Sequence, residues 1–206
     1  MSVTTAKPTS SLTALACSLA GGLALGVLTN LAQGWLPGAW NQIANSGAVW
    51  AAVAFAAGAV LAGRLRLPTL AVAGLFAELG LVAGYYGYAV LVRNDDVSSL
   101  LGWPVIWAVL ACVAGPLFAV AAAWWRRGRT GWHRAAGLGA LGAVFGAEGV
   151  HYGVVLHYPA QAWACAVVAI AVSLLAARGE RIRTLALVAV LTLLAYGAVF
   201  LPLGLL

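Results

Sequence analysis

The chain has 206 residues, of which 64% are hydrophobic and only 8% are charged, and its formal net charge is +6. Soluble domains are close to half apolar and about a quarter charged, so this composition excludes an ordinary soluble globular domain. It also excludes a collagen-like chain, because the 25 glycines follow no three-residue period and suit closely packed membrane helices. We therefore expect an all-α integral membrane protein with a single domain over residues 1–206.

Hydropathy predicts seven transmembrane helices. A helix that crosses a bilayer needs about 20 predominantly apolar residues. Stretches of this kind predict spans at 11–31, 46–62, 68–91, 103–125, 135–156, 160–177 and 183–205. The second and sixth are short. The first is too long for a signal peptide and precedes six further spans, so we interpret it as part of the helix bundle.

The positions of the basic residues predict the orientation of these spans. Lys and Arg gather on the cytoplasmic side of membrane proteins. With a cytoplasmic N-terminus, only Arg93 lies outside. The inside residues are Lys7, Arg64, Arg66, Arg126, Arg127, Arg129, Arg134, Arg178, Arg181 and Arg183. This asymmetry predicts a multi-pass protein of the inner (plasma) membrane with an outward C-terminus. It explains the positive charge without a nucleic-acid partner.

Three successive hairpins share a weak pattern, in which a helix with a Trp leads through an Arg loop to a helix with a Tyr-Gly. The matching residues are Trp50, Glu78 and Gly84-Tyr85-Tyr86-Gly87 in the first, Trp107, Glu148 and His151-Tyr152-Gly153 in the second, and Trp163 and Tyr196-Gly197 in the third. The pattern is either chance similarity in a low-complexity sequence or a three-fold hairpin repeat with one extra first helix.

Two of the five acidic residues, Glu78 and Glu148, lie deep in predicted spans, about 15 and 20 Å from the helix starts. A charged acid there costs a few kcal/mol, and no basic residue lies at similar depth. We therefore expect at least one of these carboxyl groups to be neutral at pH 7. Each is either an interhelical hydrogen-bonding group or a functional acid. We favour function, because Ser, Thr, Asn or Gln would form interhelical bonds at lower cost. Glu180, in an Arg-rich loop, is expected to be a solvated charge.

Helical spacing gives each deep acid aromatic or imidazole neighbours. Residues three, four, seven or eight positions after a Glu return to its helical face. The candidate catalytic residues are Glu78, Glu148 and His151, with His151 as a proton partner of Glu148. The candidate substrate-binding residues are Trp50, Tyr85, Tyr86, Trp107, Tyr152, Tyr196, Asn41 and Asn45. The loop acids Asp95 and Asp96 are reserve candidates.

The outer segment 32–46 contains a Pro37-Gly38 turn followed by Trp40, Asn41 and Asn45. A short amphipathic helix here is either an interfacial connector or a lid over the outer end of the bundle. As a lid, it would add amides and a Trp face to a cavity.

Metal and cofactor motifs are missing from the sequence. The three cysteines lie in apolar runs without a Cys-x-x-Cys pair, which indicates neither a disulfide framework nor a zinc site. The Glu148-x-x-His151 pair lacks the second pair found in di-iron bundles. Asn94-Asp95-Asp96-Val97-Ser98-Ser99 lacks the third acid of an Asp-Asp-x-x-Asp diphosphate motif. Phosphate-binding loops, dinucleotide fingerprints and nucleophile elbows are also missing. We expect no metal and no cofactor.

A neutral acid in an aromatic-walled apolar cavity suits two functions. In the first, a Glu protonates an alkene or epoxide of a lipid-soluble polyene. Aromatic faces then stabilise the carbocation, and a dry pocket keeps water away from it. In the second, the chain transports or captures a small solute, with Glu as a proton or cation site. A third interpretation is a structural partner in a larger complex.

Two resemblances extend this interpretation. The runs Ala44-Asn45-Ser46-Gly47-Ala48-Val49-Trp50 and Gly84-Tyr85-Tyr86-Gly87 resemble those of small actinobacterial membrane proteins of unassigned function. In size, span count and intramembrane acids, the chain is similar to the bacterial membrane terpene cyclases that close indole sesquiterpenoids such as the drimentines and xiamycins.

The second resemblance implies a metal-independent cyclase for a farnesylated aromatic substrate such as a prenylated indole. It implies that acidic residues start the reaction by protonation. From position and chemistry, our hypothesis is that Glu78 is the acid and that Glu148, with His151, is the base or second acid. The expected partners are a lipophilic small molecule and membrane lipids, with no obligate protein partner. The alternative is a small-solute transporter or a substrate-binding membrane subunit that uses the same Glu residues.

Overall fold

The computed structural model describes residues 10–38, 40–96, 98 and 101–203, which form helices and connections without a β-strand. Six helices in this part of the chain are long and apolar enough to cross a membrane, and a seventh apolar helix has 16 residues. The protein is therefore an all-helical, multi-pass membrane protein. Lys7, Ser99 and the last two residues of the predicted final span lie outside the described residues.

The helices follow the predicted spans closely, with differences at their ends. They are α1 (Ser11–Trp35), α2 (Trp40–Ala44), α3 (Gly47–Leu61), α4 (Leu67–Leu91), α5 (Trp103–Arg127), α6 (Gly131–Val150), α7 (Pro159–Leu174), α8 (Arg181–Ala195) and α9 (Leu201–Leu203). The π-helical turns η2 (His151–Val155) and η4 (Tyr196–Phe200) continue α6 and α8, and η3 (Arg178–Glu180) is a 3-10 turn.

Three of the predicted bounds differ from the structure by three or four residues. The first span ends at Trp35 rather than 31. The fifth span begins at Gly131 rather than 135, because the Thr130 side chain accepts a hydrogen bond from the His133 N–H and caps the helix. The sixth ends at Leu174 rather than 177. At 1.5 Å per residue α7 is about 24 Å long, shorter than the roughly 30 Å hydrocarbon core.

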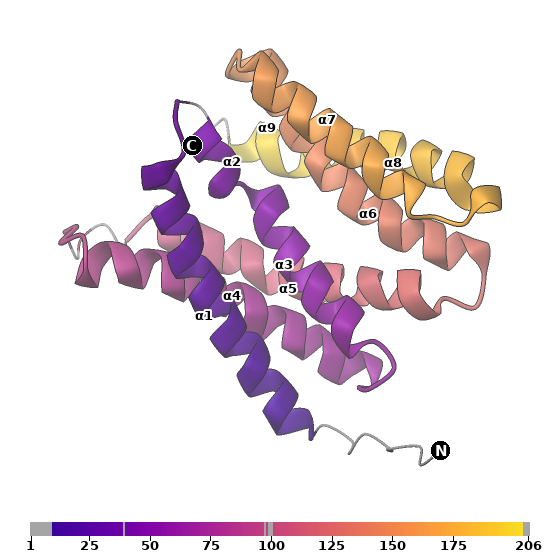
Figure 1. Cartoon of the computed structure of the whole chain (residues 1–206), viewed down its shortest axis with the longest axis horizontal. Helices are drawn as coiled ribbons and strands as arrows, with labels where there is room; N and C mark the ends of the chain where they lie inside the picture. The colour runs from indigo at the N-terminus through magenta and orange to yellow at the C-terminus, as the bar shows by residue number, and fades with distance from the viewer. Residues whose placement is uncertain (1–9, 39, 97, 99–100, 204–206) are drawn as a thin grey trace, which may run out of the picture.

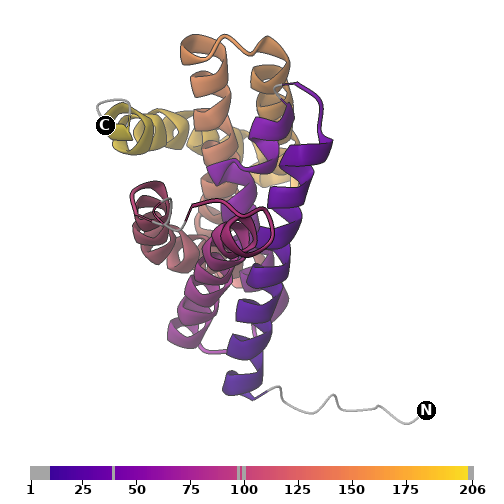
Figure 2. The ribbon, with the colours of Figure 1, turned by 90° about the vertical axis from the view of Figure 1, so that its left-hand side faces the viewer.

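Helices α1 and α4 pack closely against each other, and their ribbons adjoin in both views (Figures 1 and 2). Each carries a Gly-x-x-x-Gly pair at the contact, Gly22 and Gly26 on α1, and Gly80 and Gly84 on α4. A Cβ atom at any of the four would overlap the backbone of the other helix. Small residues of this kind let membrane helices approach closely, so these glycines set the distance between α1 and α4.

Helix α3 lies between two groups of helices, α1, α4 and α5 on one side and α6, α7 and α8 on the other (Figure 1). It packs against α4, α5 and α6, and α5 also contacts α6. The main core cluster joins α3, α5, α6 and the C-terminal end of α7. Its buried members are Ala51, Ala54, Phe55, Phe118, Ala121, Ala122, Leu138, Leu141, Val172 and Ala176. The central position of α3 brings its N-terminal end close to residues from several helices.

An ion pair joins the starts of α6 and α8. Arg134 donates to both carboxylate oxygens of Glu180, and the guanidinium of Arg183 lies 4.4 Å from the centre of the Trp132 ring. The Glu180 side chain is only 13% exposed. The expectation of a solvated charge is therefore wrong, because folding brings Arg134 within reach across 46 residues of sequence.

Candidate functional site

A cavity of about 500 Å³ lies around the N-terminal half of α3. We call it the inner chamber. Both deep acids, Glu78 of α4 and Glu148 of α6, line it, together with Trp50 of α3, Trp107 of α5 and Phe200 of η4. The wall from α6 includes Ala140, Ala143 and Ala147, whose short side chains leave space between the helices. Its volume falls in the range of about 300–1,000 Å³ common for small-molecule sites.

Glu148 connects the inner chamber to the start of α3. Its Oε1 accepts a hydrogen bond from the Ala48 N–H at 2.8 Å, while the side chain of Ser46, the N-cap residue, accepts from the Val49 N–H. The first N–H groups of a helix lack intrahelical partners and favour negative charge nearby. Glu148 is 5% exposed, and its Oε2 has no hydrogen-bond partner among the described residues. Helix capping therefore accounts for only one of its two oxygens.

Glu78 has fewer partners than Glu148. It is 2% exposed, and its Oε1 is buried without a hydrogen-bond partner in the described part of the chain. The buried Trp50 Nε1 is also unpartnered there. Since buried polar groups are normally hydrogen-bonded, two acids and an indole N–H in one chamber are available to a ligand. Interhelical bonding, the alternative role for both acids, fits Glu148 in part and finds no partner at Glu78 Oε1.

Four aromatic rings form a continuous row beside the two acids. The ring centres of Trp50 and Trp107 are 5.2 Å apart, those of Trp50 and Tyr85 5.6 Å, and those of Tyr85 and Tyr86 4.9 Å. We call these four residues the aromatic row. Trp50 and Trp107 line the inner chamber, whereas Tyr85 and Tyr86 line a second cavity. The row therefore runs from the inner chamber to the outer vestibule.

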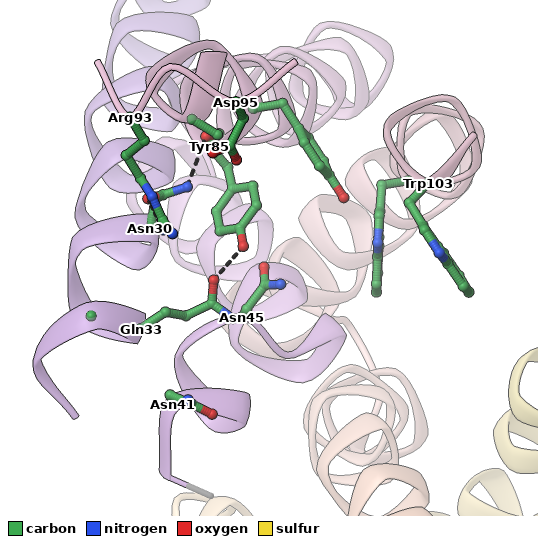
Figure 3. Close-up of a pocket in the computed structure, with 12 residues that line it drawn as sticks. Asn30, Gln33, Asn41, Asn45, Tyr85, Arg93, Asp95 and Trp103 are labelled. Atoms are coloured by element: carbon green, nitrogen blue, oxygen red, sulfur yellow. Dashed lines mark hydrogen bonds between the residues drawn. The ribbon is translucent and has the colours of Figure 1, made fainter. Parts of the chain in front are cut away.

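The second cavity, of about 680 Å³, is polar, and we call it the outer vestibule. The residues that line it are Asn30, Gln33, Gly34, Asn41, Asn45, Tyr85, Tyr86, Ala89, Arg93, Asp95, Trp103 and Trp107. Figure 3 shows Gln33, Asn45 and Tyr85 pointing toward one another and Trp103 on the opposite side. Helix α2 forms where a short helix was predicted, and its Asn41 lines this cavity, as does Asn45 just after it.

Hydrogen bonds order one wall of the outer vestibule. The Tyr85 hydroxyl donates to Gln33 Oε1, and Asn30 Nδ2 donates to the Tyr85 carbonyl at 3.1 Å (Figure 3). Arg93 Nη1 donates to Asn30 Oδ1 at 3.2 Å. These bonds join α1 to α4 and to Arg93 just after it, and they hold Tyr85 in place within the aromatic row.

The structure divides the predicted site residues among three places. Glu78, Glu148, Trp50 and Trp107 come together at the inner chamber. At the outer vestibule lie Tyr85, Tyr86, Asn41, Asn45 and Asp95, with Trp107 shared. His151, Tyr152, Tyr196 and Asp96 are not among the residues that line either cavity.

The residues outside both cavities have other contacts. The His151 ring stacks on Phe200 at 4.7 Å and makes no hydrogen bond to Glu148 within the described residues, and Tyr196 stacks on the same Phe200. Tyr152 is buried. Asp96 accepts a hydrogen bond from the Ser98 N–H in an exposed turn. His151 thus contacts the chamber wall rather than the acid.

Several lining residues were not predicted. Asn30 and Gln33 lie three residues apart on one face of α1, and this polar pair near a span end is a signal that could have identified them. Phe118, Phe200 and the alanine walls carry no such signal, because their role depends on which helices meet. Among described residues, no three His, Cys, Asp or Glu side chains gather as a metal-binding group.

The fold and cavities define a polytopic helical membrane protein with an apolar chamber and an adjoining polar vestibule. The chain belongs to DUF6518, a family of unknown function, which matches residues 5–205. No curated protein and no solved structure matches it.

Proposed function

We propose that the chain cyclises a lipid-soluble, prenylated substrate in the inner chamber by protonating it, without a metal. The observation that carries this proposal is that Glu78 and Glu148 line one apolar chamber together with Trp50 and Trp107. A buried carboxylic acid is a suitable proton donor. The Trp faces can stabilise a carbocation, and an apolar wall keeps water from intercepting it.

The hydrogen bonds support a division of roles between the two acids. Glu148 accepts an N–H from the start of α3, which favours its carboxylate form, so it is the base. Glu78, with an unpartnered oxygen, is the neutral acid. Its proton adds to a substrate alkene, the π electrons of a second alkene close the ring, and Glu148 removes a proton from the final cation. Proton transfer from Glu148 back to Glu78 then restores both groups, and the product is an isomer of the substrate.

The rim of the inner chamber supports entry from the bilayer. Three apolar residues that line the chamber are also on the outer surface of the protein, with exposed fractions of 64% for Val113, 49% for Leu117 and 62% for Leu194. These belong to α5 and α8. A lipid-soluble substrate therefore enters between these two helices without crossing water, and a farnesylated indole is a suitable candidate.

The same proposal includes a seven-span topology with a cytoplasmic N-terminus in the plasma membrane. The Arg134–Glu180 pair supports it, because the starts of α6 and α8 then lie at one end of the bundle and α7 returns between them. The three-fold hairpin repeat also stays a proposal. Trp50 and Trp107 both line the inner chamber, but Trp163 is exposed, so the third hairpin differs there.

The test is product analysis with the purified protein in lipid nanodiscs. Farnesylindole is added, and products are followed by liquid chromatography, mass spectrometry and NMR. We expect a product of unchanged mass with altered retention and alkene signals. Glu78→Gln and Glu148→Gln should abolish it, whereas Asp96→Asn, an acid-to-amide change at an exposed turn, should not. Full activity in both Gln variants would exclude the mechanism.

Transport of a small solute is the second candidate, and one observation favours it. Trp107 lines both cavities, so the inner chamber and the outer vestibule adjoin at this ring. This function predicts that a solute crosses the membrane of a proteoliposome chemically unchanged, with a pH dependence that Glu78→Gln removes. Recovery of intact compound on the far side, with no isomer formed, would support transport over cyclisation.

A further inference from the structure

The outer vestibule contains polar atoms that the proposed acid chemistry does not use. Asn41 Oδ1 and Asn45 Oδ1 are both buried without a hydrogen-bond partner among the described residues. Both residues line the vestibule, Asn41 from α2 and Asn45 from the link between α2 and α3 (Figure 3). Neighbouring Gln33 Oε1, by contrast, already accepts from Tyr85. The two Asn side chains therefore bring unpaired carbonyl acceptors to the wall of a cavity large enough for part of a ligand.

The charges at the outer vestibule favour an uncharged ligand group. Arg93 and Asp95 both line the cavity, and their formal charges cancel. The guanidinium of Arg93 already donates to Asn30. A diphosphate would need several cationic donors, and the described lining residues provide one. An O–H or N–H group, in contrast, would satisfy a buried acceptor that is otherwise costly to leave unpaired.

The two cavities adjoin at Trp107, and their chemistry differs in the way that the two ends of an amphiphile differ. The inner chamber is almost entirely apolar apart from its acids and the Trp50 N–H, whereas the outer vestibule offers amides and phenol groups. Trp107 contributes to both walls. A ligand whose apolar tail occupies the inner chamber would thus place a polar head group beyond the Trp107 ring, in the outer vestibule.

We propose that the outer vestibule binds the head group of the same ligand whose apolar tail occupies the inner chamber, and that this head is uncharged and carries an O–H or N–H donor for Asn41 and Asn45. The inference rests on the proposed function for the identity of the tail as a polyene. The class of ligand is then a prenyl chain with a hydroxyl head or a neutral aromatic N–H head such as an indole, not a prenyl diphosphate.

Three probes with one tail test this head-group preference. Farnesol, farnesyl methyl ether and farnesyl diphosphate are titrated into the full-length protein in nanodiscs, with intrinsic Trp fluorescence as the readout and empty nanodiscs as the partition control. We expect farnesol to bind about tenfold tighter than the ether, because the ether leaves a buried acceptor unpaired, and tighter than the diphosphate. Equal affinities for farnesol and its methyl ether, or a preference for the diphosphate, would overturn the proposal from measurements on the wild-type protein alone.

Substitutions then locate the preference. In the double variant Asn41→Leu/Asn45→Leu, the ratio of ether to farnesol dissociation constants should fall to about two or less, since both acceptors are gone. Gln161→Leu removes a buried amide on α7 that lines neither cavity, and it should keep the tenfold ratio. A ratio that stays near ten in the double variant would place the head group elsewhere and contradict the proposal.

The acid variants separate this inference from the proposed function. Glu78→Gln should keep the preference for farnesol while losing any cyclised product. If wild-type protein shows the preference but forms no cyclised product, the cyclase proposal fails and the head-group site stands. If product forms without a preference, the head-group site fails and the cyclase proposal stands.

Discussion

The inner chamber and the outer vestibule share Trp107, yet they are built in opposite ways. The inner chamber is a gap between alanine-rich helices into which two acids and one indole N–H project. The outer vestibule is ordered by hydrogen bonds that cross from α1 to α4. Helix packing determines the shape of the inner chamber, and a few isolated polar groups determine its reactivity. A polar hydrogen-bond network determines the shape of the outer vestibule. A substitution that disrupts one cavity should therefore leave the structure of the other cavity unchanged.

The largest expected effect concerns the acid of the inner chamber. Glu78→Gln keeps the size of the side chain but removes its transferable proton, so the rate of cyclised product formation should fall by about 100-fold or more. The rate is measured in nanodiscs by product chromatography. Affinity for farnesol should change less than threefold (roughly one hydrogen bond at most). A parallel collapse of binding would show that the two cavities are not independent.

The next variant, Gly26→Ala, is designed to disrupt the outer vestibule and to leave the inner chamber intact. Helix α1 supplies Asn30 and Gln33 to the vestibule, and none of its described residues lines the inner chamber. A Cβ at Gly26 would overlap the backbone of α4 at Leu81 and Tyr85. Gly26→Ala should destabilise the protein by about 1–3 kcal/mol and remove the farnesol preference while cyclisation continues.

Gly21→Ala is its matched control. A Cβ at Gly21 meets nothing within 4 Å, so the substitution should leave stability unchanged or raise it by up to about 1 kcal/mol. Thermal unfolding in detergent measures both variants. Equal losses in the two would contradict close packing of α1 on α4.

The two acids should differ in their effect on stability. Glu148→Leu removes the acceptor of the Ala48 N–H and should lower the free energy of unfolding by about 1–2 kcal/mol. Glu148→Gln keeps an acceptor and should lose less. Glu78→Leu removes a buried, incompletely paired group, so stability should stay level or rise. Unfolding midpoints of the three variants test this order. A larger loss in Glu78→Leu than in Glu148→Leu would reverse the assigned roles.

A smaller effect concerns Tyr85, in the middle of the aromatic row. Tyr85→Phe keeps the ring that stacks near Trp50 and Tyr86 but removes the hydroxyl that donates to Gln33. One such hydrogen bond contributes about 0.5–1.5 kcal/mol, so farnesol affinity should fall by about two- to tenfold. Product formation at saturating substrate should be unchanged. A strong loss of product formation at saturating substrate would mean that the Tyr85 hydroxyl takes part in the chemical step.

Part of the candidate site was predictable from sequence, and helical periodicity explains both the success and the failure. Glu78 and Glu148 stood out because acids are rare in apolar helices, and both line the inner chamber. Tyr85 shares a helical face with Glu78, but seven residues of helix rise about 10 Å, so it reaches the outer vestibule instead. At His151 the α-helix gives way to the π-helical turn η2, and His151 stacks on Phe200, a contact that no local pattern indicates.

The amino-acid sequence by itself determined that the chain is a multi-pass helical membrane protein, where its helices run to within a few residues, and that two acids lie deep within them. Length and hydropathy are local properties, so they need no knowledge of neighbouring helices. Only the tertiary structure decided that both acids line one chamber, that Glu148 caps α3, and that the Asn residues of the outer segment line a separate polar cavity. Those facts depend on which helices meet and how closely, and close approach depends on small residues such as Gly22 and Gly84 whose partners lie far away in the chain.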